Sequence, residues 1–153
     1  MRCFRVYVLA FVVLVSNAVY AASSVNPDSF NLSAYRGKVV YLDFWASWCG
    51  PCKLSFPYME RLKNRFSGSG LVIIADNLDQ SRANAKAFLD RTGADLPVIF
   101  DQNGILASRF NVSEMPTSVL IDRNGKVRYV DKGFFKNKEG EYTSRVLELL
   151  NEH

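Results

Sequence analysis

Two cysteines separated by a Gly-Pro dipeptide, Cys49 and Cys52, are the residues of this chain best suited to chemistry. A thiol pair at this spacing can close and reopen a small disulfide ring, and each cycle transfers two electrons. The remaining cysteine, Cys3, lies in an N-terminal segment that we expect to be removed. The sequence therefore predicts a redox function that depends on a reversible Cys49–Cys52 disulfide.

The N-terminal segment at 1–21 has the pattern of a secretory signal peptide. Arg2 and Arg5 form a short basic region, an apolar run follows at 6–15, and small residues around Ala21 suit cleavage. The apolar run is shorter than the roughly 20 residues that a membrane-spanning helix needs, so an uncleaved anchor is the weaker alternative. In both cases we expect the rest of the chain to be exported, to the periplasm or an equivalent compartment.

Length and charge indicate one ordinary domain. Removing 21 of the 153 residues leaves 132, enough to bury a core without disulfide staples. We expect a loose lead-in at 22–35 and one domain at 36–153. The signal segment holds two of the 19 basic residues and none of the 15 acidic ones, so the net charge of the remainder is about +2. Because basic and acidic residues are interleaved, nothing indicates nucleic-acid binding.

Strand-like and helix-like stretches alternate along the predicted domain. Apolar β-branched runs predict strands, and apolar residues at helical spacing predict helices. The predicted strands are 38–46, 71–75, 97–101, 117–122 and 126–131, and the predicted helices are 51–66, 80–91, 105–110 and 141–151. The alternation favours an α/β fold with helices on both faces of the sheet, and the last two strands predict a hairpin that adds an antiparallel edge.

The predicted elements place the cysteines where a strand meets a helix. Cys49 follows the first strand, and Pro51 suits the first turn of the helix, where its missing N–H costs little. Unpaired N–H groups and the helix dipole at that position favour a thiolate on Cys49, which we therefore predict to be the nucleophile. Cys52, one turn into the helix, is expected to be more buried and to attack the mixed disulfide that Cys49 forms.

Other uses of a cysteine pair fit this sequence less well. A structural disulfide across a four-residue loop constrains the unfolded chain only weakly. A structural zinc site needs four ligands, and the exported chain offers two cysteines and His153. Covalent haem attachment needs a histidine directly after the second cysteine, where Lys53 stands. We expect no metal and no bound cofactor besides the redox-active disulfide.

Asp43 is the second residue that suggests chemistry. It interrupts the apolar run at 39–45, in a strand that should be covered on both faces. A buried carboxylate is costly unless it is paired or serves a purpose, and the purpose predicted here is proton transfer. The alternative is an acid at the edge of the strand that is merely solvated or paired.

The segment from Asp43 to Lys53 resembles the active-site segment of the thioredoxin superfamily, and Met115-Pro116-Thr117 resembles its cis-proline loop. Ser55-Phe56-Pro57 and a helix-strand stretch at about 81–103 are similar to the exported TlpA-like and ResA-like branch of that superfamily. The resemblance implies a thioredoxin fold, with a mixed central β-sheet flanked by helices and a helix-strand insertion at 81–103.

The resemblance gives Asp43 a specific role. In the thioredoxin pattern this acid lies beneath the disulfide and relays a proton to or from the buried cysteine, with a pKa that burial raises toward neutrality. The chain departs from the pattern at Ala75, which stands where thioredoxin has a lysine near the acid. The resemblance thus implies that Asp43 relays protons in a differently tuned setting.

The resemblance also implies a surface that docks a substrate peptide. Pro116 is expected to be cis and to face the disulfide, and the backbone of Met115 is expected to pair with an extended peptide. Gly133 should let a partner backbone approach, and Trp48 should shield Cys49 and offer an apolar platform. The residues expected to contact substrate are Trp48, Gly50, Pro51, Met115, Pro116 and Gly133.

Together with the export signal, the resemblance implies a periplasmic thiol-disulfide oxidoreductase that acts on protein disulfides. The Gly-Pro dipeptide between the cysteines resembles the reducing members of the family, which favours a reductase. In an oxidising compartment a reductase depends on an electron donor, expected to be a membrane thiol carrier. The expected clients are disulfide-bearing envelope proteins, including apocytochromes. We expect a monomer that binds no nucleic acid.

Three alternative functions stay open from the sequence. A disulfide oxidase or isomerase is the main one, because reduction potentials in this fold span about 150 mV. A peroxide-reducing enzyme of related fold would need a lone peroxidatic cysteine. A copper-handling binding module would need wider cysteine spacing and a histidine within the domain, whereas the single histidine is His153.

Overall fold

Five β-strands and four α-helices make up the computed structural model, which describes residues 30–152. The strands are β1 (Val39–Trp45), β2 (Leu71–Asn77), β3 (Val98–Phe100), β4 (Thr117–Ile121) and β5 (Val127–Lys132). The α-helices are α1 (Cys52–Phe66), α2 (Arg82–Thr92), α3 (Ile105–Arg109) and α4 (Glu139–Asn151), and the short 3-10 helices are η2 (Leu32–Tyr35), η3 (Ser67–Ser69) and η4 (Lys136–Lys138). The predicted signal segment at 1–21 lies outside the described residues. Within 30–152, no helix has both the length and the apolar character needed to cross a membrane.

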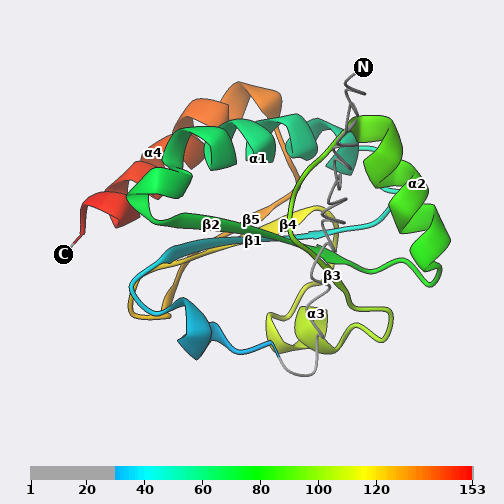
Figure 1. The fold of residues 1–153 in the computed structure, drawn as a ribbon, viewed down its shortest axis with the longest axis horizontal. Helices are drawn as coiled ribbons and strands as arrows, with labels where there is room; N and C mark the ends of the chain where they lie inside the picture. Colours follow the sequence, from blue (N-terminus) through cyan, green and yellow to red (C-terminus); the bar gives the residue numbers. More distant parts are fainter. Residues whose placement is uncertain (1–29, 153) are drawn as a thin grey trace, which may run out of the picture.

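The strands form one mixed sheet in the order β3-β2-β1-β4-β5 (Figure 1). β1, β2 and β3 are parallel, and α1 and α2 provide the two crossover connections between them. β4 and β5 run antiparallel and form the predicted hairpin. Because the central strand β1 is paired on both sides, the sheet fixes the point at which the chain leaves β1 and enters α1.

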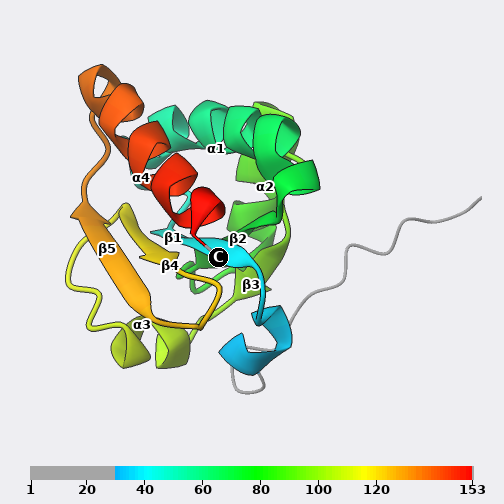
Figure 2. The ribbon, with the colours of Figure 1, turned by 90° about the vertical axis from the view of Figure 1, so that its left-hand side faces the viewer.

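Helices cover both faces of the sheet, as the alternating pattern predicts. α1, α2 and α4 pack on one face, and α3 with η2 packs on the other (Figure 2). All seven residues of β1 are buried as a result. On the α1 face, the rings of Trp45, Phe56 and Phe88 lie 4.8–5.0 Å apart. Burying an aromatic side chain of this kind contributes about 2–3 kcal/mol, so this cluster anchors α1 beneath the cysteine turn.

Every predicted strand and helix is present, and the differences lie at the ends. The starts of α2 and α4 differ from the prediction by two residues, and β2 continues through Asp76 and Asn77, two residues beyond the predicted end at Ala75. β3 pairs with this part of β2, so the polar residues gain ladder hydrogen bonds that their own sequence does not reveal. The helix-strand insertion expected at 81–103 is present as α2 and β3, with β3 at the edge of the sheet.

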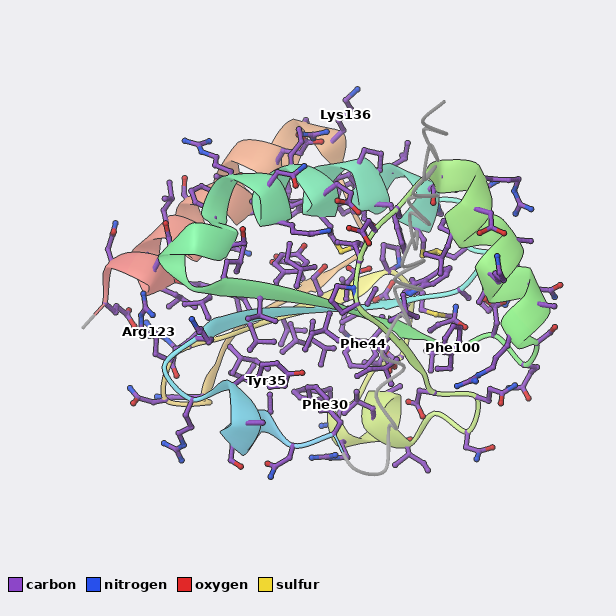
Figure 3. All side chains as sticks on the ribbon, in the orientation of Figure 1. Phe30, Tyr35, Phe44, Phe100, Arg123 and Lys136 are labelled. Atoms are coloured by element: carbon purple, nitrogen blue, oxygen red, sulfur yellow. A yellow bond between two sulfur atoms is a disulfide. The ribbon has the colours of Figure 1, made fainter. Side chains whose placement is uncertain are left out.

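The expectation of a loose lead-in at 22–35 is wrong for the part that the structure describes. Phe30 is buried under the sheet, and its ring lies 5.8 Å from that of Tyr35, on the same side as Phe44 (Figure 3). Asn31 starts η2, because its side chain accepts a hydrogen bond from the Ser33 N–H at 2.9 Å. Two aromatic residues in a polar stretch therefore bury enough apolar surface to fix this segment.

Candidate active site

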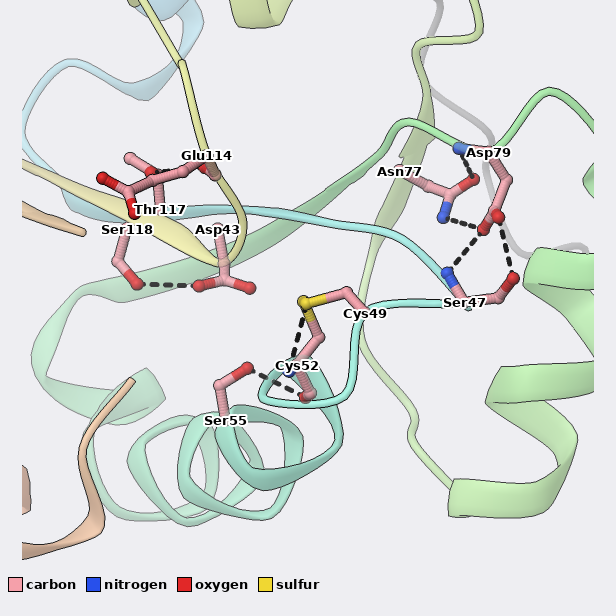
Figure 4. Close-up of a disulfide and its surroundings, with 10 residues drawn as sticks. All are labelled: Asp43, Ser47, Cys49, Cys52, Ser55, Asn77, Asp79, Glu114, Thr117 and Ser118. Atoms are coloured by element: carbon pink, nitrogen blue, oxygen red, sulfur yellow. Dashed lines mark hydrogen bonds between the residues drawn. A yellow bond between two sulfur atoms is a disulfide. The ribbon is translucent and has the colours of Figure 1, made fainter. Parts of the chain in front are cut away.

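The cysteine turn links the end of β1 to the start of α1. The Cys49 N–H donates to the Ala46 carbonyl oxygen at 3.1 Å, which closes the turn. Pro51 has helical backbone angles, φ −63° and ψ −25°, and caps the helix, so Cys52 is its first residue. The structure thus places both cysteines at a helix N-terminus, as the sequence predicts (Figure 4).

The two cysteines form a disulfide. The Cys52 N–H donates to Cys49 Sγ at 3.3 Å, so a backbone donor of the helix already faces this sulfur. After reduction the same N–H would stabilise a thiolate on Cys49. Cys49 is 5 % exposed, whereas Cys52 is fully buried. This geometry favours Cys49 as the sulfur that meets a partner disulfide and Cys52 as the resolving thiol.

A hydrogen-bonded clamp that was not anticipated from the sequence holds the turn from the side of β2. The buried carboxylate of Asp79 accepts hydrogen bonds from the Ser47 N–H at 2.8 Å and from the Ser47 hydroxyl at 2.7 Å (Figure 4). The side-chain amide of Asn77 donates to the same carboxylate at 2.7 Å. The clamp fixes the backbone two residues before Cys49. Its signal in the sequence is the pair of polar residues in Asn77-Leu78-Asp79, which begins two positions after the apolar run at 71–75.

Asp43 lies in β1 on the α1 face of the sheet and is fully buried. Burial raises the pKa of its carboxyl to about 7, and a hydrogen bond from Ser118 opposes this rise. The Ser118 hydroxyl donates to Asp43 Oδ1 at 2.7 Å. The second oxygen, Oδ2, has no hydrogen-bond partner within 30–152 and points toward the cysteine turn (Figure 4). A carboxyl with a pKa near neutrality and one free oxygen is suited to accept and return a proton.

The neighbours of Asp43 in the sheet are both uncharged. On β2 its register partner is Ala75, which is the position where the resemblance implies a lysine in thioredoxin. On β4 its register partner is Ser118, whose hydroxyl provides the hydrogen bond described above. The signal for Ser118 was its place as a polar residue inside a predicted buried strand, but the register that brings it to Asp43 could not be deduced from the sequence.

The loop before β4 lies beside the cysteine turn (Figure 4). Its Met115–Pro116 peptide bond is cis, as the resemblance implies. The Gly133 N–H donates to the Pro116 carbonyl oxygen at 2.7 Å. Gly133 itself has a positive φ of +75°. A Cβ at Gly133 would lie 3.3 Å from the Phe135 ring in a backbone conformation that other residues rarely adopt. Met115, Pro116 and Gly133 therefore meet at one edge of the site, and their contact with a substrate peptide stays a prediction.

Trp48, Gly50 and Pro51 form the exposed rim of the cysteine turn. Trp48 is 71 % exposed and directly precedes Cys49, whereas Trp45 is fully buried in the aromatic cluster. An indole ring left in solvent beside a reactive sulfur gives a partner protein an apolar surface to bury. Binding of substrate by these three rim residues stays a prediction.

A second buried carboxyl, Asp76, lies on the opposite face of the sheet and does not join the site. It pairs in register with Phe44 and Ile99, which both pack on the α3 side. Burial and the nearby charge of Asp101 raise the pKa of Asp76 to about 8. The Asp101 carboxylate accepts hydrogen bonds from N–H groups at the start of α3, 2.7–3.0 Å. This acid pair belongs to the α3 core, and it was not predicted because the predicted strand ended at Ala75.

Comparisons with known proteins agree with a thiol-disulfide active site at Cys49 and Cys52. The chain matches the redoxin family over residues 14–147. It is 34 % identical over 114 residues to the thiol-disulfide oxidoreductase ResA of Geobacillus thermodenitrificans and 36 % identical over 122 residues to that of Geobacillus kaustophilus. These alignments cover 74 % and 80 % of this chain and 66 % and 70 % of the two relatives, so the chain spans about two thirds of their length.

A solved structure is similar in both fold and sequence. The crystal structure of a putative thiol:disulfide interchange protein DsbE from Chlorobium tepidum has a TM-score of 0.76 to this chain and is 42 % identical, covering 78 % of this chain and 85 % of that one. The family match extends over most of the sequence, and the structural match includes the mixed sheet that positions the cysteine turn. The chain belongs to the redoxin family, within the thioredoxin superfamily, as a ResA-like thiol-disulfide oxidoreductase.

Proposed function

We propose that this chain is an exported reductase of protein disulfides that transfers electrons through the Cys49–Cys52 dithiol. The observation that carries the proposal is the cysteine pair at the start of α1, where the Cys52 N–H faces Cys49 Sγ. The Cys49 thiolate attacks one sulfur of a client disulfide, which forms a mixed disulfide and releases the other client sulfur as a thiolate. Cys52 then attacks Cys49 Sγ, so the chain is oxidised to its disulfide and the second client thiolate leaves.

The proposed direction of electron transfer, from this chain to a client disulfide, determines which partners the chain needs. Its support is the Gly50-Pro51 dipeptide, which resembles that of the reducing members of the superfamily. Each turnover oxidises the cysteine pair, so a membrane thiol carrier is proposed as electron donor, with disulfide-bearing envelope proteins, including apocytochromes, as clients. The dithiol carries the electrons itself, so we propose no further cofactor. We also propose that the protein is a monomer. Within residues 30–152, no three histidine, cysteine, aspartate or glutamate side chains are grouped to hold a metal ion.

An equilibrium titration of the cysteine pair against glutathione or dithiothreitol tests the direction. We expect a reduction potential near the reducing end of the range for this fold, about −270 mV. At each ratio of reduced to oxidised reagent, free thiols are alkylated and the mass of the protein gives its reduced fraction. The titration curve should be the same whether it starts from the reduced or the oxidised protein. A potential near −120 mV would contradict a reductase and favour the oxidase or isomerase.

The export part of the proposal rests on the pattern at 1–21, whose structure lies outside the described residues. We propose a signal peptide or membrane anchor there and a thioredoxin-like domain at 36–153, together with the segment at 30–35 that packs under its sheet. Expressed at full length, the domain should become accessible to protease added to spheroplasts, and a cleaved chain should begin near residue 22. A protease-protected chain that still begins at Met1 would contradict export.

A further inference from the structure

Two buried hydroxyl groups connect to Asp43 in a chain. The Tyr41 hydroxyl donates to Ser118 Oγ at 2.9 Å, and the Ser118 hydroxyl donates to Asp43 Oδ1 at 2.7 Å. All three residues are buried. We propose that Ser118 and Tyr41 are positioning residues, which hold Asp43 Oδ1 and leave Oδ2 to exchange the proton of Cys52. This inference rests on the proposed function, because it assigns residues to the resolving step.

The hydroxyl chain has one possible direction when Asp43 is ionised. A carboxylate only accepts hydrogen bonds, so the single proton of the Ser118 hydroxyl must point to Oδ1. The Ser118 oxygen then accepts from Tyr41. Burial raises the pKa of Tyr41 well above its ordinary value, and the charge of Asp43 acts in the same direction. Tyr41 therefore stays protonated and remains a donor over the whole range in which thiols react.

The Ser118 hydroxyl, and not a cation, makes the stabilising contact with the Asp43 carboxylate. The register neighbour on β2 is Ala75, and Asp43 makes no ion pair within 30–152. Without Ser118, both carboxyl oxygens would be buried and unpaired, which disfavours the charged form. The Ser118 hydrogen bond lowers the pKa of Asp43 against the effect of burial, and the result is about 7. At this value the carboxyl can both take up and release a proton near neutral pH.

Other titratable groups on the same face do not replace Ser118. They are Asp131 and Tyr129 on β5, Arg145 and Tyr142 on α4, and Tyr58 and Cys52 on α1. Asp131 and Arg145 form an ion pair with each other. The causes that shift the pKa of Asp43 are burial and the Ser118 hydrogen bond. Ser118 is therefore the contact through which the proton affinity of Asp43 can be changed without altering its charge.

The proton step balances within the resolving reaction. Cys52 passes its thiol proton to Asp43 Oδ2 and becomes a thiolate. This thiolate attacks Cys49 Sγ, a Cys49–Cys52 bond forms, and the bond between Cys49 and the client sulfur breaks. The bonding electron pair leaves with the client thiolate, which takes up the proton that Asp43 or water returns.

Two successive thiolate releases from dithiobis(nitrobenzoate) in stopped flow separate the relevant steps. The first coloured thiolate reports attack by Cys49, and the second reports attack by Cys52. We expect Ser118→Ala to raise the pH midpoint of the second release by about one pH unit, because a hydrogen bond to the carboxylate is lost. At pH 7 the second release should then be about fivefold slower, while the first release is unchanged.

Matched variants distinguish a positioning role from a general effect on the fold. Ser118→Thr keeps the hydroxyl and should restore the midpoint, and Tyr41→Phe should raise it by less than Ser118→Ala does. Tyr58→Phe removes a buried hydroxyl whose partner is Thr143, so it should leave the midpoint in place.

A double-mutant cycle completes the test. In an Asp43→Asn background, Ser118→Ala should produce no further shift of the pH profile. The inference is overturned by an unchanged midpoint in both Ser118→Ala and Tyr41→Phe, or by an equal shift in the Asp43→Asn background. If the unaltered chain itself shows no second release, the proposed dithiol function fails instead, so the two failures are distinguishable.

Discussion

The Cys52→Ala variant is expected to accumulate a stable mixed disulfide between Cys49 and a client, whereas Cys49→Ala should form none. Cys49 receives the helix N–H donor and is the less buried sulfur, so it is the one that attacks. Resolution by Cys52 is intramolecular, and effective concentrations in such reactions reach about 10⁵ M or more, so without Cys52 the mixed disulfide persists until a reductant is added. Turnover of a protein disulfide should therefore fall to background in both variants.

Non-reducing electrophoresis and mass measurement after mixing reduced protein with a disulfide-bearing client reveal the trapped adduct. The adduct should disappear on addition of dithiothreitol, and the double variant lacking both cysteines should give none. The Cys49→Ala variant is the matched control, since it makes the same chemical change three positions away. An adduct that forms on Cys49→Ala and not on Cys52→Ala would reverse the two roles. Used in the native envelope, Cys52→Ala would also identify the clients.

Features that depend on neighbours in sequence were predictable here. The cysteine turn lies between a strand and a helix because an apolar run ends at Trp45 and helical spacing begins after Pro51. Asp43 could be singled out because a lone acid within an apolar strand has few explanations. The cis form of the Met115–Pro116 bond was expected only through the family resemblance, since base rates for proline favour trans.

Features that depend on strand register were not predictable from the sequence. Ser118 reaches Asp43 across 75 positions of sequence, and a shift of one residue between β1 and β4 would turn one of them to the opposite face. The Asp79 clamp on Ser47 likewise spans 32 positions. The extra residues of β2 exist because β3 pairs with them. In each case the polar residue is visible in the sequence, but its partner is set by the sheet.

Asp43→Asn should slow the resolving step by about tenfold at pH 7. The pKa of Asp43 is about 7, so the proton acceptor is present above this pH and is lost below it. In the variant, Cys52 must lose its proton to solvent, and its burial disfavours the thiolate. Even an exposed thiol, with a pKa of about 8.5, is only a few per cent ionised at pH 7. Asparagine can still accept the Ser118 hydrogen bond through its Oδ1, so the change removes the acid function and keeps the shape.

The ratio of native to variant rate should depend on pH in a defined way. As the pH rises into the alkaline range, Cys52 ionises increasingly without help and the two rates should approach each other. The ratio should grow as the pH falls toward 7, and below 7 it should level off because the native carboxyl also becomes protonated. The second thiolate release from dithiobis(nitrobenzoate), followed from about pH 5 to pH 9.5, measures this ratio. A ratio that is constant over the whole range would remove Asp43 from the mechanism.

Asp43→Asn should slow the resolving step and yet increase the free energy of unfolding at pH 8. In the unfolded chain Asp43 has an ordinary pKa of about 3.9, and in the folded chain burial raises its pKa to about 7. Between these values the folded state holds a proton that the unfolded state has lost, so the free energy of unfolding falls as the pH rises from about 4 to 7. Asparagine carries no such proton, so urea unfolding should find Asp43→Asn more stable than the native chain at pH 8 and less distinct from it at pH 4. A slower resolving step in a more stable protein can then be assigned to lost proton transfer and not to a damaged fold.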